Sequence, residues 1–259
     1  MTRSADLVDA LDGLLEPERF QDGQVNGLQV EGKPEIERLA VAVSVNQEVL
    51  DAAVAWGADG LLTHHGLLWN AEARHLRGVQ RRRAATLLAA DMNLITYHLP
   101  LDAHPQVGNN ASLAAAAGCT AFEPGLGYKG TPIGMVGQLA EPMAVSAWTE
   151  RFEAALRQGC DVATGPFQVW LFGPDEIRSI GFVSGAAPYQ VADAIELGLD
   201  AYVTGEVTEP AYHLAKEAGI HFIAGGHYLT ERLGVQRLAA WAAERFDLEW
   251  RFFDVATEA

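Results

Sequence analysis

The chain has 259 residues, 49% of them hydrophobic, so it can bury a full core as one large domain or two smaller ones. Its 34 acidic and 18 basic side chains give a net charge of −16, which repels phosphate backbones and anionic lipid and so disfavours nucleic acid and membrane surfaces as partners. No apolar run approaches the roughly 20 residues of a membrane-spanning helix, and acids interrupt the N-terminal segment, which excludes a signal peptide and leads us to expect a soluble, cytoplasmic protein.

An internal repeat organises the chain. The segment 41–66, VAVSVNQEVLDAAVAWGADGLLTHHG, aligns at a constant offset with 182–207, FVSGAAPYQVADAIELGLDAYVTGEV. In each copy a short apolar strand leads to a helix with apolar positions at helical spacing, which a glycine ends before a second strand begins. A further helix and strand follow each copy, in LRGVQRRRAATLLAADMNLITYH and in PAYHLAKEAGIHFIAGG. This order predicts an α/β fold of two related modules with parallel strands.

The region between the copies has a different character. In residues 122–180, Gly and Pro punctuate short alternating runs, which indicates a hairpin-plus-helix insertion in the second module. The predicted helix, VSAWTERFEAAL, has apolar side chains on one face: Val145, Trp148, Phe152 and Leu156. The predicted domains are therefore 1–121 and 122–259, with residues 225–259 contributing to a site that both modules share.

Histidines and carboxylates gather where three of the predicted strands end. They form three pairs: His64 and His65, His98 and Asp102, and His227 and Glu231. Because functional groups of parallel sheets lie at the carboxyl ends of the strands, we expect these side chains to converge in a cleft between the modules. Any one such histidine could be a hydrogen-bonded structural residue, but their recurrence at three strand ends favours a metal site.

The spacing of the pairs predicts their local structure. His227 and Glu231, four residues apart, can share a face in the first turn of a helix. Pro100 removes a helical hydrogen bond, so we expect His98 and Asp102 to lie in a loop that folds back on itself. The other histidines are interpreted as surface residues or as neighbours of the site: His75, His104, His213 and His221.

The ligand types indicate which metals fit. The two cysteines, Cys119 and Cys160, are far apart and form no CxxC motif, which argues against a disulfide framework and thiolate zinc. Imidazole and carboxylate groups suit zinc, manganese, iron, nickel or cobalt better than copper(I) or calcium. Adjacent histidines favour two ions, and such a pair would lower the pKa of a bridging water toward neutrality. The sequence therefore predicts two divalent metal ions per chain.

At these residues the sequence resembles the YbgI-like dinuclear metal-binding family, the GTP cyclohydrolase type-two homologues. The matching segments are NGLQVEGK (26–33), THHGLLW (63–69), HLPLDAHPQVGNN (98–110), YVTGEV (202–207) and GGHYLTERLG (225–234). The resemblance implies that the metal ligands are His64, His65, Asp102, His227 and Glu231, with His98 as a further ligand or near neighbour. It also implies a homohexameric ring, built as a trimer of dimers, with the metal centres facing an internal cavity.

Two hypotheses of function follow. The first is a metal-dependent hydrolase of a small nucleotide-like or phosphorylated substrate; opening of the GTP ring at C8 with release of formate is one version, although the chain has no GxxxxGK[ST] loop. The second is a non-catalytic metal-binding or adaptor protein that forms a ring. Glu206, at the repeat position of His65, is the candidate general base, and the alternative for it is a solvent-facing acid at a strand end.

Overall fold

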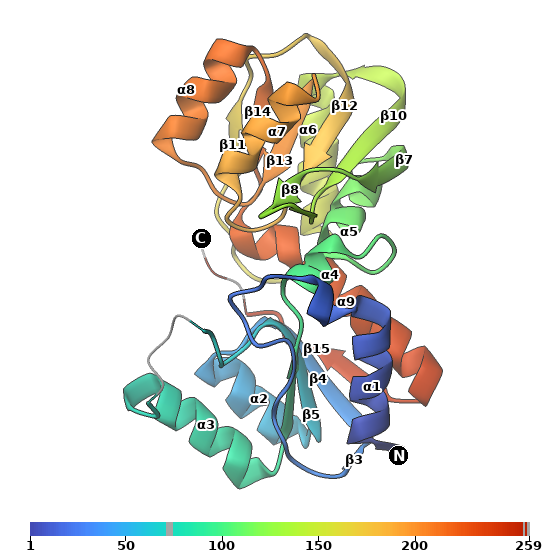
Figure 1. Ribbon diagram of the computed structural model, residues 1–259, viewed down its shortest axis with the longest axis vertical. Coiled ribbons are helices and arrows are strands. Elements are labelled where there is room, and N and C mark those ends of the chain that lie inside the picture. The colour runs from blue at the N-terminus through green and yellow to red at the C-terminus, as the bar shows by residue number, and fades with distance from the viewer. Residues whose placement is uncertain (71–74, 256, 258–259) are drawn as a thin grey trace. The chain divides into compact units, whose positions relative to one another are not determined.

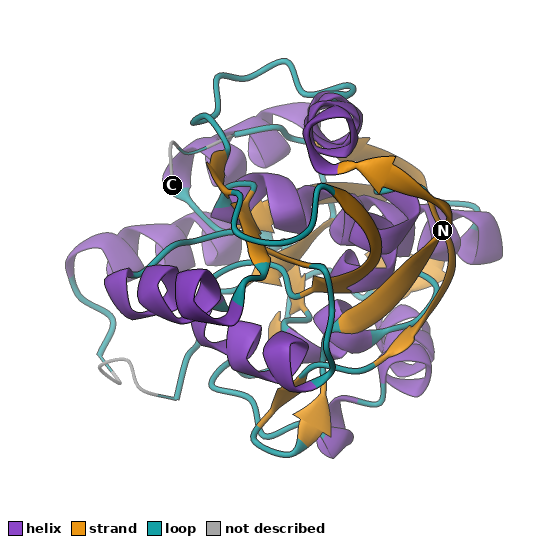
Figure 2. Ribbon diagram, turned by 90° about the horizontal axis from the view of Figure 1, so that it is seen from above, coloured by secondary structure: helices purple, strands orange, loops and turns teal. Residues whose placement is uncertain are grey.

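The computed structural model shows a mixed α/β protein whose strands and helices can be followed in Figures 1 and 2. The structure describes residues 1–70, 75–255 and 257. Among these residues, no helix combines the length and the apolar character that a bilayer crossing requires.

Contacts divide the chain into two compact units. The first comprises residues 1–101 and 235–255, and the second comprises residues 102–234 together with Thr257. This division differs from the expected boundary after residue 121, because the chain enters the second unit at residue 102 and returns to the first at residue 235. Two helices therefore contain residues of both units: α4 (Leu99–Ala103) and α9 (His227–Phe246).

The sheet of the first unit has the strand order β15, β4, β5, β6, β2. These strands are β2 (Gly27–Val30), β4 (Arg38–Ser44), β5 (Gly60–His65), β6 (Asn93–Thr96) and β15 (Glu249–Phe252). Strands β15, β4, β5 and β6 pair in parallel, and β2 pairs antiparallel with β6. The predicted crossover helices are α2 (Gln47–Trp56) and α3 (Gly78–Ala90). The N-terminal part adds β1 (Thr2–Arg3), α1 (Ser4–Leu15), the 3₁₀ helix η1 (Pro17–Arg19) and β3 (Glu35–Ile36).

Local sequence sets the ends of α2. Asn46 precedes the helix and accepts a hydrogen bond from the backbone N–H of Val49 at 2.9 Å, which is an N-cap. Gly57, with φ +77°, ends the helix in the left-handed conformation that glycine favours. The apolar residues Val49, Leu50 and Ala53 of this helix are buried, whereas Val54 is 41% exposed.

The sheet of the second unit has the strand order β11, β14, β13, β12, β10, β7. These strands are β7 (Cys119–Pro124), β10 (Met135–Ala144), β11 (Gln168–Trp170), β12 (Glu176–Phe182), β13 (Ala201–Thr204) and β14 (His221–Ala224). As predicted, β12, β13 and β14 are parallel; β7, β10 and β11 pair antiparallel. The helices are α5 (Asn109–Ala116), α6 (Val145–Arg157), η2 (Pro188–Gln190), α7 (Val191–Glu196) and α8 (Glu209–Ala218). A small hairpin joins β8 (Gly127–Tyr128) to β9 (Thr131–Pro132).

The helix predicted in the middle region is α6, and its apolar face is buried as expected. Trp148 and Phe152 stack with ring centroids 5.1 Å apart. They belong to a core that also contains Ile180 of β12 and Val203 of β13. This helix therefore packs within the second unit.

Two aspartates that the repeat alignment pairs, Asp59 and Asp200, make the same hydrogen bonds. Each accepts two backbone N–H groups from the preceding strand region: Glu37 and Arg38 for Asp59 (3.0 Å each), and Arg178 and Ser179 for Asp200 (2.8 Å each). The bonded residues also correspond in the alignment. Superposition of the two modules stays a prediction.

Candidate metal centre

In the first unit, His64, His65 and His98 lie together. His64 and His65 end strand β5, and His98 follows strand β6. One ring nitrogen of each histidine lies within 4.8 Å of a ring nitrogen of the other two. Their ring centroids are 4.6 Å apart for His64 and His65, and 5.1 Å apart for His64 and His98. The end of β5 thus brings both adjacent histidines into one cluster, as the sequence predicts.

Hydrogen bonds orient each of these rings. Each Nδ1 atom has a partner: the backbone carbonyl of Tyr97 for His64 (2.9 Å), Ser44 Oγ for His65 (2.9 Å), and Asp22 Oδ1 for His98 (2.8 Å). A histidine that binds a metal through one nitrogen characteristically holds its other nitrogen in such a bond. Nε2 is therefore the atom through which each ring could bind a metal.

Asp22 is a buried carboxylate that holds His98. Its side chain is 3% exposed and also accepts bonds from Asn26 Nδ2 and from the backbone N–H groups of Gln24 and Leu99. Burial by itself would raise the pKa of Asp22, but the hydrogen bonds from His98 and Asn26 lower it by more. The pKa of Asp22 therefore lies well below its usual range. Asp22 is therefore ionised at neutral pH and fixes the His98 ring.

In the second unit, Asp102 and His227 each lie close to Glu231. His227 and Glu231 lie in the first turn of α9, where His227 Nε2 is 3.2 Å from Glu231 Oε1, so the prediction from their spacing is confirmed. A carboxylate oxygen of Asp102 lies within 4.8 Å of one of Glu231. Both carboxylates are almost fully buried, at 5% and 3% exposure. Buried carboxylates this close repel each other unless a cation lies between them.

Asp102 lies in a helix, so the predicted loop is wrong. Pro100 lies in the first turn of α4, where a backbone N–H would have no acceptor inside the helix, so proline is tolerated there. Oδ1 of Asp102 accepts hydrogen bonds from Asn109 Nδ2 (2.8 Å) and Ser184 Oγ (2.7 Å). These two bonds fix the orientation of the carboxylate.

His227 lies between two carboxylates. Its Nδ1 is 2.6 Å from Oε1 of Glu206, whose side chain is 43% exposed. Burial lowers the pKa of His227, but Glu231 and Glu206 raise it more, to about 10. Surroundings that stabilise a positive charge on this ring also stabilise a divalent cation bound to it.

Gly185 allows the second-unit group to assemble. Its φ of +65° is in the left-handed region, and a Cβ at this position would overlap with Oε1 of Glu231 and lie 3.1 Å from Nε2 of His227. Gly205 is equally constrained, because a Cβ there would lie 2.7 Å from the Cα of His227. Backbone approaches this close require glycine.

The remaining histidines lie apart from these groups. His221 is buried in β14, where its Nδ1 accepts the N–H of Gly173 (3.1 Å) and its Nε2–H donates to the carbonyl of Pro174 (2.7 Å), so it is a core histidine rather than a surface residue. His75 and His213 are exposed, and His104 Nδ1 accepts N–H groups in an exposed turn.

The donor set of both groups fits a divalent metal. It consists of imidazole and carboxylate, and the two cysteines, which are free, belong to neither group among the described residues. Burial raises the pKa of Cys119 to about 12, which makes it a poor ligand. The prediction that both groups share one cleft stays untested.

The residues that orient these side chains were not predicted from the sequence. Asn109 lies in the segment 98–110 that carries the family resemblance, and Ser44 and Ser184 lie in the two repeat copies, so each had a signal. Asp22 had none, because an isolated short polar residue is common and its partner lies far away in the chain.

Comparisons with known proteins identify the family of this chain. A family model described as Duf34/NIF3 (NGG1p interacting factor 3) matches residues 2–259. A GTP cyclohydrolase 1 type 2 homolog of Pseudomonas aeruginosa is 42% identical over 257 residues, which cover 98% of this chain and 97% of the relative. The Escherichia coli (strain K12) protein of the same name is 37% identical over 259 residues, covering 99% of this chain and 100% of the relative.

Solved structures give the same result over the whole chain. A structure described as protein ybgI, of unknown function, has a TM-score of 0.91 at 36% identity, and TTHA1606 from Thermus thermophilus has a TM-score of 0.86 at 32% identity. Both comparisons cover 100% of this chain and of the other chain. The resemblance drawn from the sequence is confirmed, and the chain belongs to the Duf34/NIF3 family.

Proposed function

We propose that this protein binds two divalent metal ions through His64, His65, Asp102, His227 and Glu231 and hydrolyses a small nucleotide-like or phosphorylated substrate. The observation that carries the proposal is the orientation of the ligands. Three histidines are clustered in one unit, and in the other unit His227 and Asp102 each lie close to Glu231. Each histidine ring has its Nδ1 held in a hydrogen bond. Ligands prepared in this way bind metal without further ordering.

The path of the chain supports a joint site. Asp102 follows His98 by four residues, so covalent connection alone keeps their Cα atoms within about 14 Å. Glu231 lies four residues before Val235, where the chain returns from the second unit to the first. Each ligand group thus adjoins a point where the chain passes from one unit to the other, and we propose that they bind the ions together, with His98 as a ligand or a close neighbour.

The buried carboxylates determine how two ions can be held. Two dications at a typical separation of about 3.5–4 Å need negative charge between them. Glu231, rigid in the first turn of α9 and 3% exposed, is the proposed bridge. When bound, an ion pair of this kind activates water for hydrolysis. Zinc, manganese, iron, nickel and cobalt all accept this donor set.

Glu206 is the proposed proton acceptor. One of its oxygens holds His227 at 2.6 Å, and 43% of its side chain is exposed, so the group adjoins the metal ligands and also reaches solvent. A general base must lie within hydrogen-bonding reach of the proton that it removes. The name of the relatives makes GTP the first substrate to test.

Metal content of purified variants tests the ligand assignment. After gel filtration in metal-free buffer, elemental analysis of wild type should approach two ions per chain. Glu231→Gln preserves shape but removes the charge that offsets repulsion between the ions, so its content should fall well below half. His65→Ala should lose less, because water can replace one neutral ligand. The matched control is Glu217→Gln, an exposed acid on α8, which should retain wild-type content.

If Glu231→Gln keeps both ions, the bridging assignment is wrong and Asp102 becomes the better candidate. Turnover is tested next, with metal-loaded wild type and a panel of nucleotides and phosphoesters. We expect hydrolysis that Glu231→Gln abolishes. A protein with two bound ions and no turnover on any substrate would instead support the alternative, a non-catalytic metal-binding or adaptor protein.

A further inference from the structure

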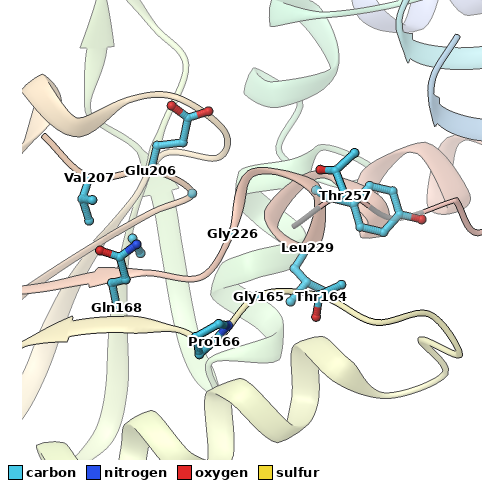
Figure 3. A pocket seen from close by; sticks show the side chains of 12 residues that line it. Thr164, Gly165, Pro166, Gln168, Glu206, Val207, Gly226, Leu229 and Thr257 are labelled. Atoms are coloured by element: carbon cyan, nitrogen blue, oxygen red, sulfur yellow. The ribbon is translucent and has the colours of Figure 1, made fainter. Parts of the chain in front are cut away.

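A pocket of about 310 Å³ lies in the second unit, beside the N-terminus of α9 (Figure 3). Its walls come from residues 164–168, which lead into β11, from residues 205–207 after β13, and from the start of α9. Two of these segments also carry site residues, because Glu206 lines the pocket and His227 lies between the lining residues Gly226 and Tyr228. The pocket is therefore next to the second-unit ligand group.

The lining has a distinct chemical character. Glu206 is its only charged side chain among the described residues, and neither Lys nor Arg contributes. Figure 3 shows Gln168, Glu206 and Val207 on one side and Leu229 on the other. Pro166, Val207 and Leu229 offer apolar surface, while Glu206 accepts hydrogen bonds and the Gln168 amide both donates and accepts them.

These features exclude several ligand types. A phosphate would meet a carboxylate and no cation, so its charge is better stabilised by metal. A hydrocarbon would offer no hydrogen bond to the Gln168 amide or to the second carboxylate oxygen of Glu206. The volume is at the small end of the range for ligand pockets, about 300–1,000 Å³, so it fits a ring system rather than a whole nucleotide. An uncharged ring with apolar faces and a polar edge satisfies all of these conditions.

We infer that this pocket binds a lactam-type nitrogen heterocycle, such as a nucleobase whose ring N–H lies beside a carbonyl. Glu206 accepts the ring N–H, and the Gln168 amide donates to the adjacent carbonyl. Pro166, Val207 and Leu229 contact the faces of the ring. The inference deepens the proposed function and rests on it for the reaction, since it places a heterocycle rather than a phosphate beside the ligands His227 and Glu231.

Binding of nucleosides to the full-length protein tests this inference, with and without prior chelation of metal. Calorimetry should show that inosine binds at least about tenfold more tightly than 1-methylinosine, in which a methyl group replaces the ring N–H, because an unpaired hydrogen-bonding group costs about 1–3 kcal/mol. The preference should persist in chelated protein, since every lining residue belongs to the second unit. Inorganic phosphate should not bind to the chelated protein.

Two variants and one control locate the binding. Val207→Trp fills the pocket and should abolish inosine binding, whereas Val54→Trp, the same substitution at an exposed position of α2, should leave it unchanged. Gln168→Ala should weaken inosine binding by about fivefold to tenfold, because the ring carbonyl loses its donor.

Equal binding of inosine by Val207→Trp and wild type would overturn the inference. So would equal affinity for inosine and 1-methylinosine, or phosphate binding to the chelated protein that Val207→Trp removes. These outcomes leave the metal analysis of Glu231→Gln unaffected, so failure of the pocket and failure of the metal centre can be told apart.

Discussion

Replacement of Gly185 by alanine tests whether the backbone of the second unit is shaped around Glu231. Gly185 has φ +65°, and an alanine Cβ there would overlap with Oε1 of Glu231. Glu231 is 3% exposed, so its carboxylate cannot simply turn into solvent. The substitution must therefore displace the carboxylate or the segment after β12 that carries Gly185.

A second glycine separates the two contributions to the energy. Gly198 has nearly the same φ, +67°, but a Cβ there would meet nothing within 4 Å. Gly198→Ala thus costs only the strain of an alanine backbone in the left-handed region, about 1–2 kcal/mol. Gly185→Ala adds overpacking of a buried contact, about 1–3 kcal/mol more. Alanine also restricts the unfolded chain more than glycine does, which favours folding. This effect is the same in both variants, so it cancels when their stabilities are compared.

Thermal unfolding and metal analysis measure the difference. For a chain of this size each kcal/mol lowers Tm by about 2–4 °C, so Gly185→Ala should unfold several degrees below Gly198→Ala. It should also lose metal, whereas Gly198→Ala should keep wild-type content. Equal Tm values and equal metal contents for the two variants would show that Glu231 is not held against Gly185.

Four further predictions can be checked independently. Burial raises the pKa of Asp59, but Lys33 and backbone N–H groups lower it by more, to below the ordinary 3.8, so the ionised carboxylate stabilises the fold above that pH. Asp59→Asn should therefore lower Tm at pH 7, and the difference in Tm from wild type should disappear in strong acid. In chelated protein, the pKa of His227 is raised to about 10, so protonation of this ring stabilises the fold fully below pH 6.5. This stabilisation is lost as the pH rises through about 10, and an NMR titration of the imidazole should detect the pKa. In an experimental structure, the backbone of residues 41–66 should superpose on that of residues 182–207; different secondary structures there would disprove the repeat. Light scattering should give a closed oligomer, which we propose is a hexameric trimer of dimers, and a mass near the 27.9 kDa of one chain would contradict it.

The sequence by itself predicted the features that depend on local pattern. Alternating strands and helices, the buried face of α6 and the pairing of His227 with Glu231 all follow from spacing along a helix or strand. The strand ends could also be located, because apolar runs stop there and polar residues begin. That is why His64 and His65 were identified as neighbours in one cluster.

The tertiary structure decided what depends on residues far apart in the chain. Asp22 holds His98 from 76 residues away, and Ser184 holds Asp102 from 82 residues away. Neither partner has a periodic signal, because a single short polar side chain fits loops and turns everywhere. The orientation of the ligands, and the return of the chain to the first unit at Val235, are therefore set by packing between distant segments and not by local sequence.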